Sequence, residues 1–175
     1  MIVALTGFHA AGKSYLAQVM AESLGWVHFH KQNQMKVFYE KQRLNHLNLP
    51  DWNSWQVKMF QENGHYEVMS WLLGGVRNDQ ILVVDSLHHP DEWKAVRDFD
   101  SRAILVGIFT PNTVRSVRRD EGEDELDAKR QSYWHDENHR RCLLSSVEWS
   151  FVGSLSREEL ERQCHALKGY LDSLE

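Results

Sequence analysis

The chain has 175 residues, a length that suits one domain with a sizeable hydrophobic core. Its formal net charge of −5 and its 26% charged residues are ordinary for a globular protein and argue against a general nucleic-acid binder. No apolar run approaches the roughly 20 residues of a membrane span, and the first apolar segment begins at Ile2, so we expect neither a membrane segment nor a cleaved leader. Cys142 and Cys164 form no metal or redox motif, which favours a cytoplasmic protein with free thiols.

The N-terminal segment contains the most specific motif of the chain. Residues 2–5 form an apolar run typical of a buried strand, and residues 15–24 repeat apolar side chains at helical spacing. Between them, residues 7–14 read Gly-Phe-His-Ala-Ala-Gly-Lys-Ser, which matches the phosphate-loop pattern G-x-x-x-x-G-K-[ST]. Backbone N–H groups and a helix N-terminus bind a polyphosphate in such a loop. The expected nucleotide-binding residues are Gly7, His9, Ala10, Ala11, Gly12, Lys13, Ser14 and Tyr15.

The expected cofactors are ATP and Mg²⁺, and three residues have the chemistry to act on them. Lys13 would meet the β- and γ-phosphates, and the Ser14 hydroxyl would ligate Mg²⁺. Asp85 ends the apolar run at residues 81–84, where a second carboxylate of a phosphate-loop protein is expected. This carboxylate would hold Mg²⁺ or accept a proton from the attacking hydroxyl.

Apolar strands alternate with helical patterns along the chain. Strands are expected at residues 26–30, 81–84, 103–109 and 149–152, and helices at 51–71 (with a break at Gly64), 90–99, 113–119, 136–144 and 157–173. This order predicts an α/β fold with a parallel sheet of about five strands, helices on both faces, and one domain over residues 1–175. Ligands bind at the carboxyl ends of such strands, so the phosphate loop, His30, Asp85 and Thr110 should share one edge.

Residues 115–141 hold seven of the twenty basic residues of the chain, and they suggest a lid over the phosphates. Arginine side chains stabilise the charge that develops during phosphoryl transfer, and Arg115 and Arg119 are the preferred candidates. Acidic residues share this segment, so a solvated, salt-bridged face is the alternative.

The order of these segments resembles the nucleoside-monophosphate-kinase superfamily, and within it the dephospho-coenzyme A kinases and their archaeal relatives. Residues 83–92, Val-Val-Asp-Ser-Leu-His-His-Pro-Asp-Glu, stand where that family has V-V-D-G-x-R-x-x-E-E. Residues 152–160 resemble the family's C-terminal segment, whose loop borders the adenine, and this places Gly153 beside the nucleotide. The resemblance implies a three-layer P-loop kinase fold, phosphoryl transfer from ATP to a nucleotide-like or coenzyme-like acceptor, and an acceptor-binding arm at residues 32–76.

Two departures from the family pattern leave the acceptor open. Residues 31–39 contain no carboxylate, and His88 replaces the arginine expected after Asp85. One alternative is a kinase for hydroxymethylated bases in viral DNA, in which the tryptophans stack a base and Lys31, Lys36, Lys41 and Arg43 follow the backbone. The net acidity weighs against it. Another alternative is a nucleotide-dependent switch or binding protein with slow hydrolysis.

The arm is rich in aromatic and amide side chains, which suit a flat ring held by stacking and hydrogen bonds. The alternative is that its tryptophans pack the arm's own helices. His28 and His30 are expected on opposite sides of their strand, with His30 nearest the ligand edge. The residues expected to contact the acceptor are His30, Asn33, Trp52, Trp55 and His88.

Overall fold

A computed structural model of the chain describes residues 1–45, 49–76, 79–120 and 137–174. In this part of the chain five parallel strands form one sheet in the order β2-β3-β1-β4-β5. The strands are β1 (Ile2–Gly7), β2 (Val27–Phe29), β3 (Leu82–Leu87), β4 (Ile104–Phe109) and β5 (Trp149–Val152). The predicted α/β fold is confirmed, although the strand expected to end near Asp85 continues to Leu87.

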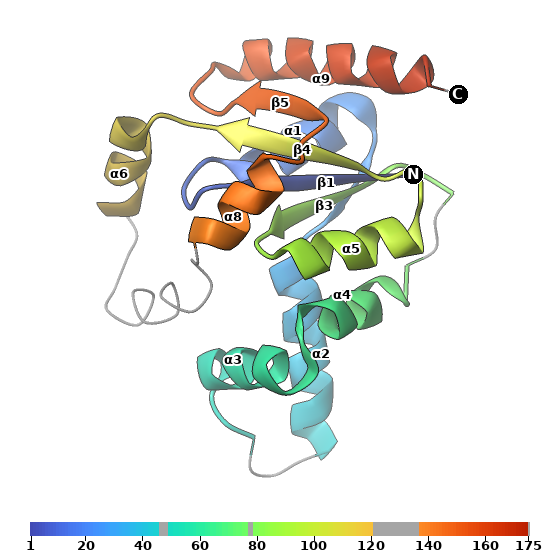
Figure 1. Ribbon diagram of the computed structural model, residues 1–175, viewed down its shortest axis with the longest axis vertical. Coiled ribbons are helices and arrows are strands. Elements are labelled where there is room, and N and C mark those ends of the chain that lie inside the picture. The colour runs from blue at the N-terminus through green and yellow to red at the C-terminus, as the bar shows by residue number, and fades with distance from the viewer. Residues whose placement is uncertain (46–48, 77–78, 121–136, 175) are drawn as a thin grey trace.

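Helices cover both faces of the sheet and give it three layers (Figure 1). Val3 and Leu5 of β1 point to a core shared with α1 (Lys13–Leu24) and α9 (Arg157–Asp172). Ile2 and Ala4 point to the other core, which α4 (His65–Leu73), α5 (Pro90–Phe99) and α8 (Glu137–Leu144) cover. Successive residues of a strand alternate between faces, so a strand buried on both sides reads as a continuous apolar run.

The predicted arm is a helical extension beside the sheet, made of α2 (Lys31–Asn45), α3 (Trp52–Asn63) and α4 (Figure 1). The predicted break at Gly64 separates α3 from α4, because Gly64 adopts a positive φ of 83° that other residues rarely adopt. Asp51 caps α3 by accepting hydrogen bonds from the backbone N–H groups of Asn53 and Ser54. The arm has its own apolar core, built around Met35, Trp55 and Val68 and their neighbours.

Helix α6 (Asn112–Asp120) follows β4 at the start of the predicted lid. Residues 121–136 of that lid lie outside the described residues, whereas its last part belongs to α8. Among the described helices, none is long and apolar enough to span a bilayer.

A buried ion pair joins the arm to the sheet. The ammonium of Lys31, at the first turn of α2, lies 2.9 Å from Glu92 Oε2 on α5, and both side chains are buried. Glu92 also accepts a hydrogen bond of 2.8 Å from the backbone N–H of His88, and its Oε1 lies 3.2 Å from His65 Nδ1. Burial alone would raise the pKa of Glu92, but Lys31 and His65 lower it to about 2. The carboxylate is therefore charged at neutral pH.

We expect Glu92→Leu to destabilise the protein by about 3–5 kcal/mol, because it leaves the Lys31 ammonium buried without its partner. The double variant Lys31→Met/Glu92→Leu should recover most of this loss. Since the folded pKa lies below the ordinary value, the stabilisation by Glu92 is present above about pH 4.5 and is lost as pH falls toward 2. Urea unfolding measures these free energies. Glu62→Leu, which breaks an exposed pair with Lys58, is the control and should cost less than about 1 kcal/mol. Equal losses of unfolding free energy in Glu92→Leu and Glu62→Leu would contradict this account.

Candidate functional site

The phosphate loop has the conformation that its glycines predict. A Cβ at Gly7 would lie 2.7 Å from the carbonyl oxygen of Ile108, so only glycine fits between β1 and β4 at this point. Gly12 has a φ of 97° and forms the N-cap of α1. Ala10 has a φ of 56°, which is rare for a residue with a side chain and indicates a backbone held in place by its surroundings. The loop therefore leads directly into a helix N-terminus, which attracts anions.

Gly153, which follows β5, packs against the phosphate loop. A Cβ at Gly153 would overlap the Thr110 hydroxyl and the Ala11 carbonyl oxygen. Thr110 itself donates a hydrogen bond of 2.8 Å to that carbonyl. The structure thus places Gly153 against the phosphate loop, and its predicted contact with the nucleotide stays a prediction. Tyr15, in contrast, lies on the exposed side of the first turn of α1.

Asp85 lies at the centre of the site and is fully buried. Ala4 pairs with Val84 and Thr6 pairs with Leu87, so β3 contains one more residue than β1 across this step. The resulting β-bulge falls at Asp85 and Ser86, and Ser86 has a φ of 62°. Bulges redirect side chains, and here the Asp85 carboxylate meets the end of the phosphate loop. The Ser14 hydroxyl donates a hydrogen bond of 2.9 Å to Asp85 Oδ2.

Strand β2 and helix α2 also contact the Asp85 carboxylate. The backbone N–H of Lys31 donates to Oδ1 at 3.1 Å, and His28 Nε2 lies 3.2 Å from Oδ2. His30 Nδ1 lies 3.8 Å from the same oxygen, and its side chain is partly exposed. The prediction that His28 and His30 face opposite sides is wrong, because residues two apart in a strand share a face and these two rings stack with centroids 5.4 Å apart.

Lys13 is buried among other cations. Its ammonium donates hydrogen bonds to the carbonyls of Gly7 at 3.1 Å and Phe8 at 3.0 Å. Burial, followed by the positive charge of Arg140, lowers the pKa of Lys13 to about 7, whereas Asp85 acts in the opposite direction. Arg140, on α8, is also buried, and burial together with Arg115 lowers its pKa to about 10. A cluster of desolvated cations at a helix N-terminus fits a polyanion.

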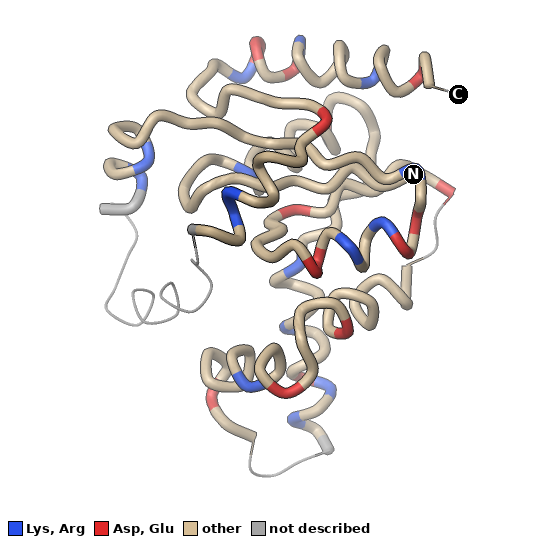
Figure 2. Tube along the Cα trace, in the orientation of Figure 1, with Lys and Arg blue, Asp and Glu red and all other residues tan. Residues whose placement is uncertain are grey.

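Two arginines of α6 reach the phosphate loop. The guanidinium of Arg115 lies over the Phe8 ring at 4.8 Å and donates to the carbonyl oxygen of Thr110 at 3.2 Å. Arg118, which the sequence analysis did not single out, donates to the carbonyl oxygens of Ala10 at 3.2 Å and Gly153 at 3.0 Å. The side chain of the predicted Arg119 lies outside the described part of the chain. Figure 2 shows basic positions on both α6 and α8, the described ends of the predicted lid.

The backbone N–H of His88 donates to Glu92 of the ion pair that anchors the arm, and the imidazole interacts electrostatically with Lys31 and Lys13. Burial, followed by the charges of Lys31 and Lys13, holds its pKa well below the ordinary value, so its imidazole is neutral at neutral pH. The Lys31–Glu92 pair was not predicted, and Arg118 belonged to the predicted lid but was not a preferred candidate. Their partners come from distant parts of the sequence, and no local motif marks them.

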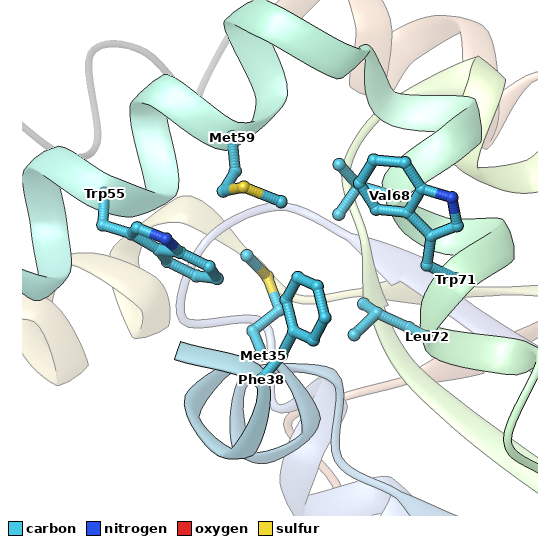
Figure 3. A pocket seen from close by; sticks show the side chains of 7 residues that line it. All are labelled: Met35, Phe38, Trp55, Met59, Val68, Trp71 and Leu72. Carbon is cyan, nitrogen blue, oxygen red and sulfur yellow. The ribbon is translucent and has the colours of Figure 1, made fainter. Parts of the chain in front are cut away.

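The predicted stacking role of Trp55 is wrong. Its side chain is only 3% exposed, and its indole N–H donates to Gln42 Oε1 at 2.9 Å. The Trp52 ring stacks on Trp55 with centroids 5.6 Å apart. Figure 3 shows Trp55 and Met59 of α3 pointing toward Met35 and Phe38 of α2. The tryptophans therefore pack the arm's own helices, which was the alternative interpretation. Asn33 lies on the exposed side of α2, in a shallow groove beside Lys36 and Val37.

The donors at the loop fit the expected cofactors. The Ser14 hydroxyl and the Asp85 carboxylate are oxygen ligands of the kind that Mg²⁺ prefers, and they lie within hydrogen-bond distance of each other. When bound, Mg²⁺ would supply charge neutralisation between phosphate oxygens. Lys13 and the N–H groups of the loop would bind the phosphates themselves.

No protein-family model matches the chain, and no curated protein matches it either. Solved structures are similar to it along nearly its whole length. Shikimate kinase from Bacteroides thetaiotaomicron has a TM-score of 0.63 at 16% identity, with 98% of each chain covered. Shikimate kinase from Aquifex aeolicus vf5 has a TM-score of 0.57 at 18% identity, with 97% of this chain and 98% of that chain covered. A gluconokinase from Sinorhizobium meliloti 1021 has a TM-score of 0.59 at 13% identity, with 98% of this chain and 94% of that chain covered.

These similarities confirm the predicted P-loop kinase fold, whereas the particular likeness to dephospho-coenzyme A kinase is not confirmed. The chain has the three-layer fold of P-loop small-molecule kinases.

Proposed function

We propose that this protein is an ATP-dependent kinase that transfers the γ-phosphoryl group to a hydroxyl of a small-molecule acceptor. The observation that carries the proposal is the contact between Ser14 and Asp85, 2.9 Å apart at the N-terminus of α1 and next to the buried Lys13. This combination of hydroxyl, carboxylate and ammonium suits a triphosphate with its magnesium ion. The kinases with a similar fold support the proposal.

Each residue has a role that follows from its position. Lys13 and the loop N–H groups bind the phosphates, and Ser14 and Asp85 hold the metal ion. Arg115 and Arg140 would stabilise the charge that develops on the transferred phosphoryl group, and the burial of Arg140 would strengthen its interaction. Arg119 remains a candidate for the same role. His30, whose Nδ1 lies 3.8 Å from Asp85 Oδ2, and His88 are the candidates for contact with the acceptor.

Two observations favour a small acceptor over DNA. Lys31, one of the residues expected to follow a DNA backbone, is buried against Glu92 and cannot do so. Trp52 and Trp55, expected to stack a base, stack on each other. The names of the similar structures, shikimate kinase and gluconokinase, point to polyhydroxylated acids, whereas the sequence resemblance points to nucleotide-like or coenzyme-like acceptors.

A screen of acceptors tests the proposal. ATP consumption is measured by a coupled assay with shikimate, D-gluconate, nucleoside monophosphates, dephospho-coenzyme A and a hydroxymethylated DNA oligonucleotide. The expected result is that one small acceptor raises turnover far above the rate with water. Turnover only on the oligonucleotide would favour the DNA kinase, and no stimulation by any acceptor would favour the nucleotide-dependent switch.

We expect ATP binding at pH 8 to take up about one proton through Lys13. The pKa of this lysine is about 7 in the free protein, so it is mostly neutral at pH 8. Phosphate oxygens favour the charged ammonium and raise the pKa, so affinity should fall as pH rises above 7. Isothermal titration calorimetry in buffers of different ionisation enthalpy measures the uptake. In Lys13→Met the uptake and phosphoryl transfer should both be lost while the protein stays folded, and a normal uptake in that variant would refute the assignment.

Gly153→Ala should weaken ATP binding by at least about tenfold, because the new Cβ overlaps the Thr110 hydroxyl and the Ala11 carbonyl and displaces the phosphate loop. The matched control is Gly169→Ala in α9, where no atom lies within 4 Å of an added Cβ. That control should bind ATP normally and gain about 0.5–1 kcal/mol of stability from helix propensity. Equal ATP affinity in the two variants, measured by calorimetry, would contradict the close packing of Gly153.

A further inference from the structure

Two amide side chains of α3 have hydrogen-bonding atoms that no described residue satisfies. Gln56 is fully buried, and neither its Nε2 nor its Oε1 has a hydrogen-bond partner among the described residues. The buried Oδ1 of Asn53, one turn earlier on the same helix, also lacks one. Amides of the arm are otherwise paired where they face its core: Gln42 accepts from Trp55, and Asn63 donates to the Met59 carbonyl. The two unpaired amides therefore need a separate explanation.

Buried polar groups are nearly always hydrogen-bonded, since leaving them unpaired costs stability. Pairing with a ligand is one reason for a protein to keep such a group. Replacing it with an apolar side chain of similar size would otherwise stabilise the fold.

The side of α3 on which Gln56 lies indicates which ligand would pair with its amide. Phe60, one turn after Gln56 and on the same side of α3, has its ring 4.7 Å from His65. His65 contacts Glu92 of α5 and stacks on His89 with centroids 4.0 Å apart, so this side of α3 faces the start of α4 and, beyond it, the start of α5. The side that carries Trp55 packs against α2 instead. In Figure 1, α3 lies on the same side of the molecule as the carboxyl ends of the strands.

We propose that Asn53 and Gln56 bind an uncharged polar part of the phosphoryl acceptor, one that both donates and accepts hydrogen bonds. The proposal rests on the kinase function proposed above. Gln56 Oε1 and Asn53 Oδ1 need donors, whereas a carboxylate or phosphate only accepts, so an anionic group does not fit here. Hydroxyl groups and ring amides both fit. Any anionic group of the acceptor lies instead toward the cations Lys13, Arg115 and Arg140.

The test compares Gln56→Leu with the wild type. The apolar side chain has a similar volume and removes the unpaired amide, so Tm should rise by about 2–4 °C. The acceptor KM should rise by about tenfold to a hundredfold, with the KM for ATP unchanged. Asn53→Leu should shift the acceptor KM in the same direction. Gln61→Leu, which removes an exposed amide from the same helix, is the matched control and should change neither constant.

The probes are shikimate and D-gluconate, which offer hydroxyl groups, and thymidine 5′-monophosphate, which offers a ring amide. The probe that is phosphorylated shows whether hydroxyl groups or a ring amide pair with Asn53 and Gln56. A lower Tm in Gln56→Leu would show that the amide stabilises the free protein, and this would overturn the inference, as would an unchanged acceptor KM. If a probe raises the wild-type Tm and no probe is phosphorylated, the result counts against the kinase function, whereas the inference still requires that this Tm shift is lost in Gln56→Leu. If none of the probes binds, the assigned acceptor chemistry is overturned.

Discussion

The site depends on one buried carboxylate. Asp85 lies in a β-bulge of the sheet, where water cannot solvate it, so its charge must be stabilised by the protein. Three parts of the chain meet this need: the Ser14 hydroxyl of the phosphate loop, the His28 ring of β2, and the first backbone N–H of α2. The same contacts that satisfy Asp85 hold the nucleotide loop and the base of the arm in a fixed relation. The need to stabilise the Asp85 carboxylate thus positions both the phosphate loop and the base of the arm.

The distribution of charge separates two regions of the site. Near the phosphate loop, Lys13 and Arg140 are buried, and burial, followed by the positive charge of neighbouring cations, lowers the pKa of each. In the second region, at the base of the arm, Lys31 forms an ion pair with Glu92, and that pair attaches the arm rather than binding a ligand. In the proposed function, a bound triphosphate would place negative charge beside Lys13 and Arg140, and this would favour their charged forms.

The sequence predicts the features that local patterns encode. The phosphate loop, the buried strands and the break at Gly64 follow from residue order and spacing, and they lie where they were expected except that β3 continues to Leu87. The contacts of Arg118 and the pairing of Lys31 with Glu92 join residues far apart in the chain, so no periodicity could show them. Trp55 was assigned to the ligand because aromatic composition does not reveal which way a ring points. The identity of the acceptor could not be predicted for the same reason, because tertiary contacts build its pocket.

Calorimetric titration of ATP with and without Mg²⁺, in the wild type and in Asp85→Asn, tests the central claim most directly. If Ser14 and Asp85 hold the metal ion between them, Mg²⁺ should tighten ATP binding to the wild type by at least about tenfold. In Asp85→Asn this enhancement should vanish, while binding of ATP without metal stays close to that of the wild type. An undiminished effect of Mg²⁺ in the variant would show that the metal ion binds elsewhere and would contradict the account.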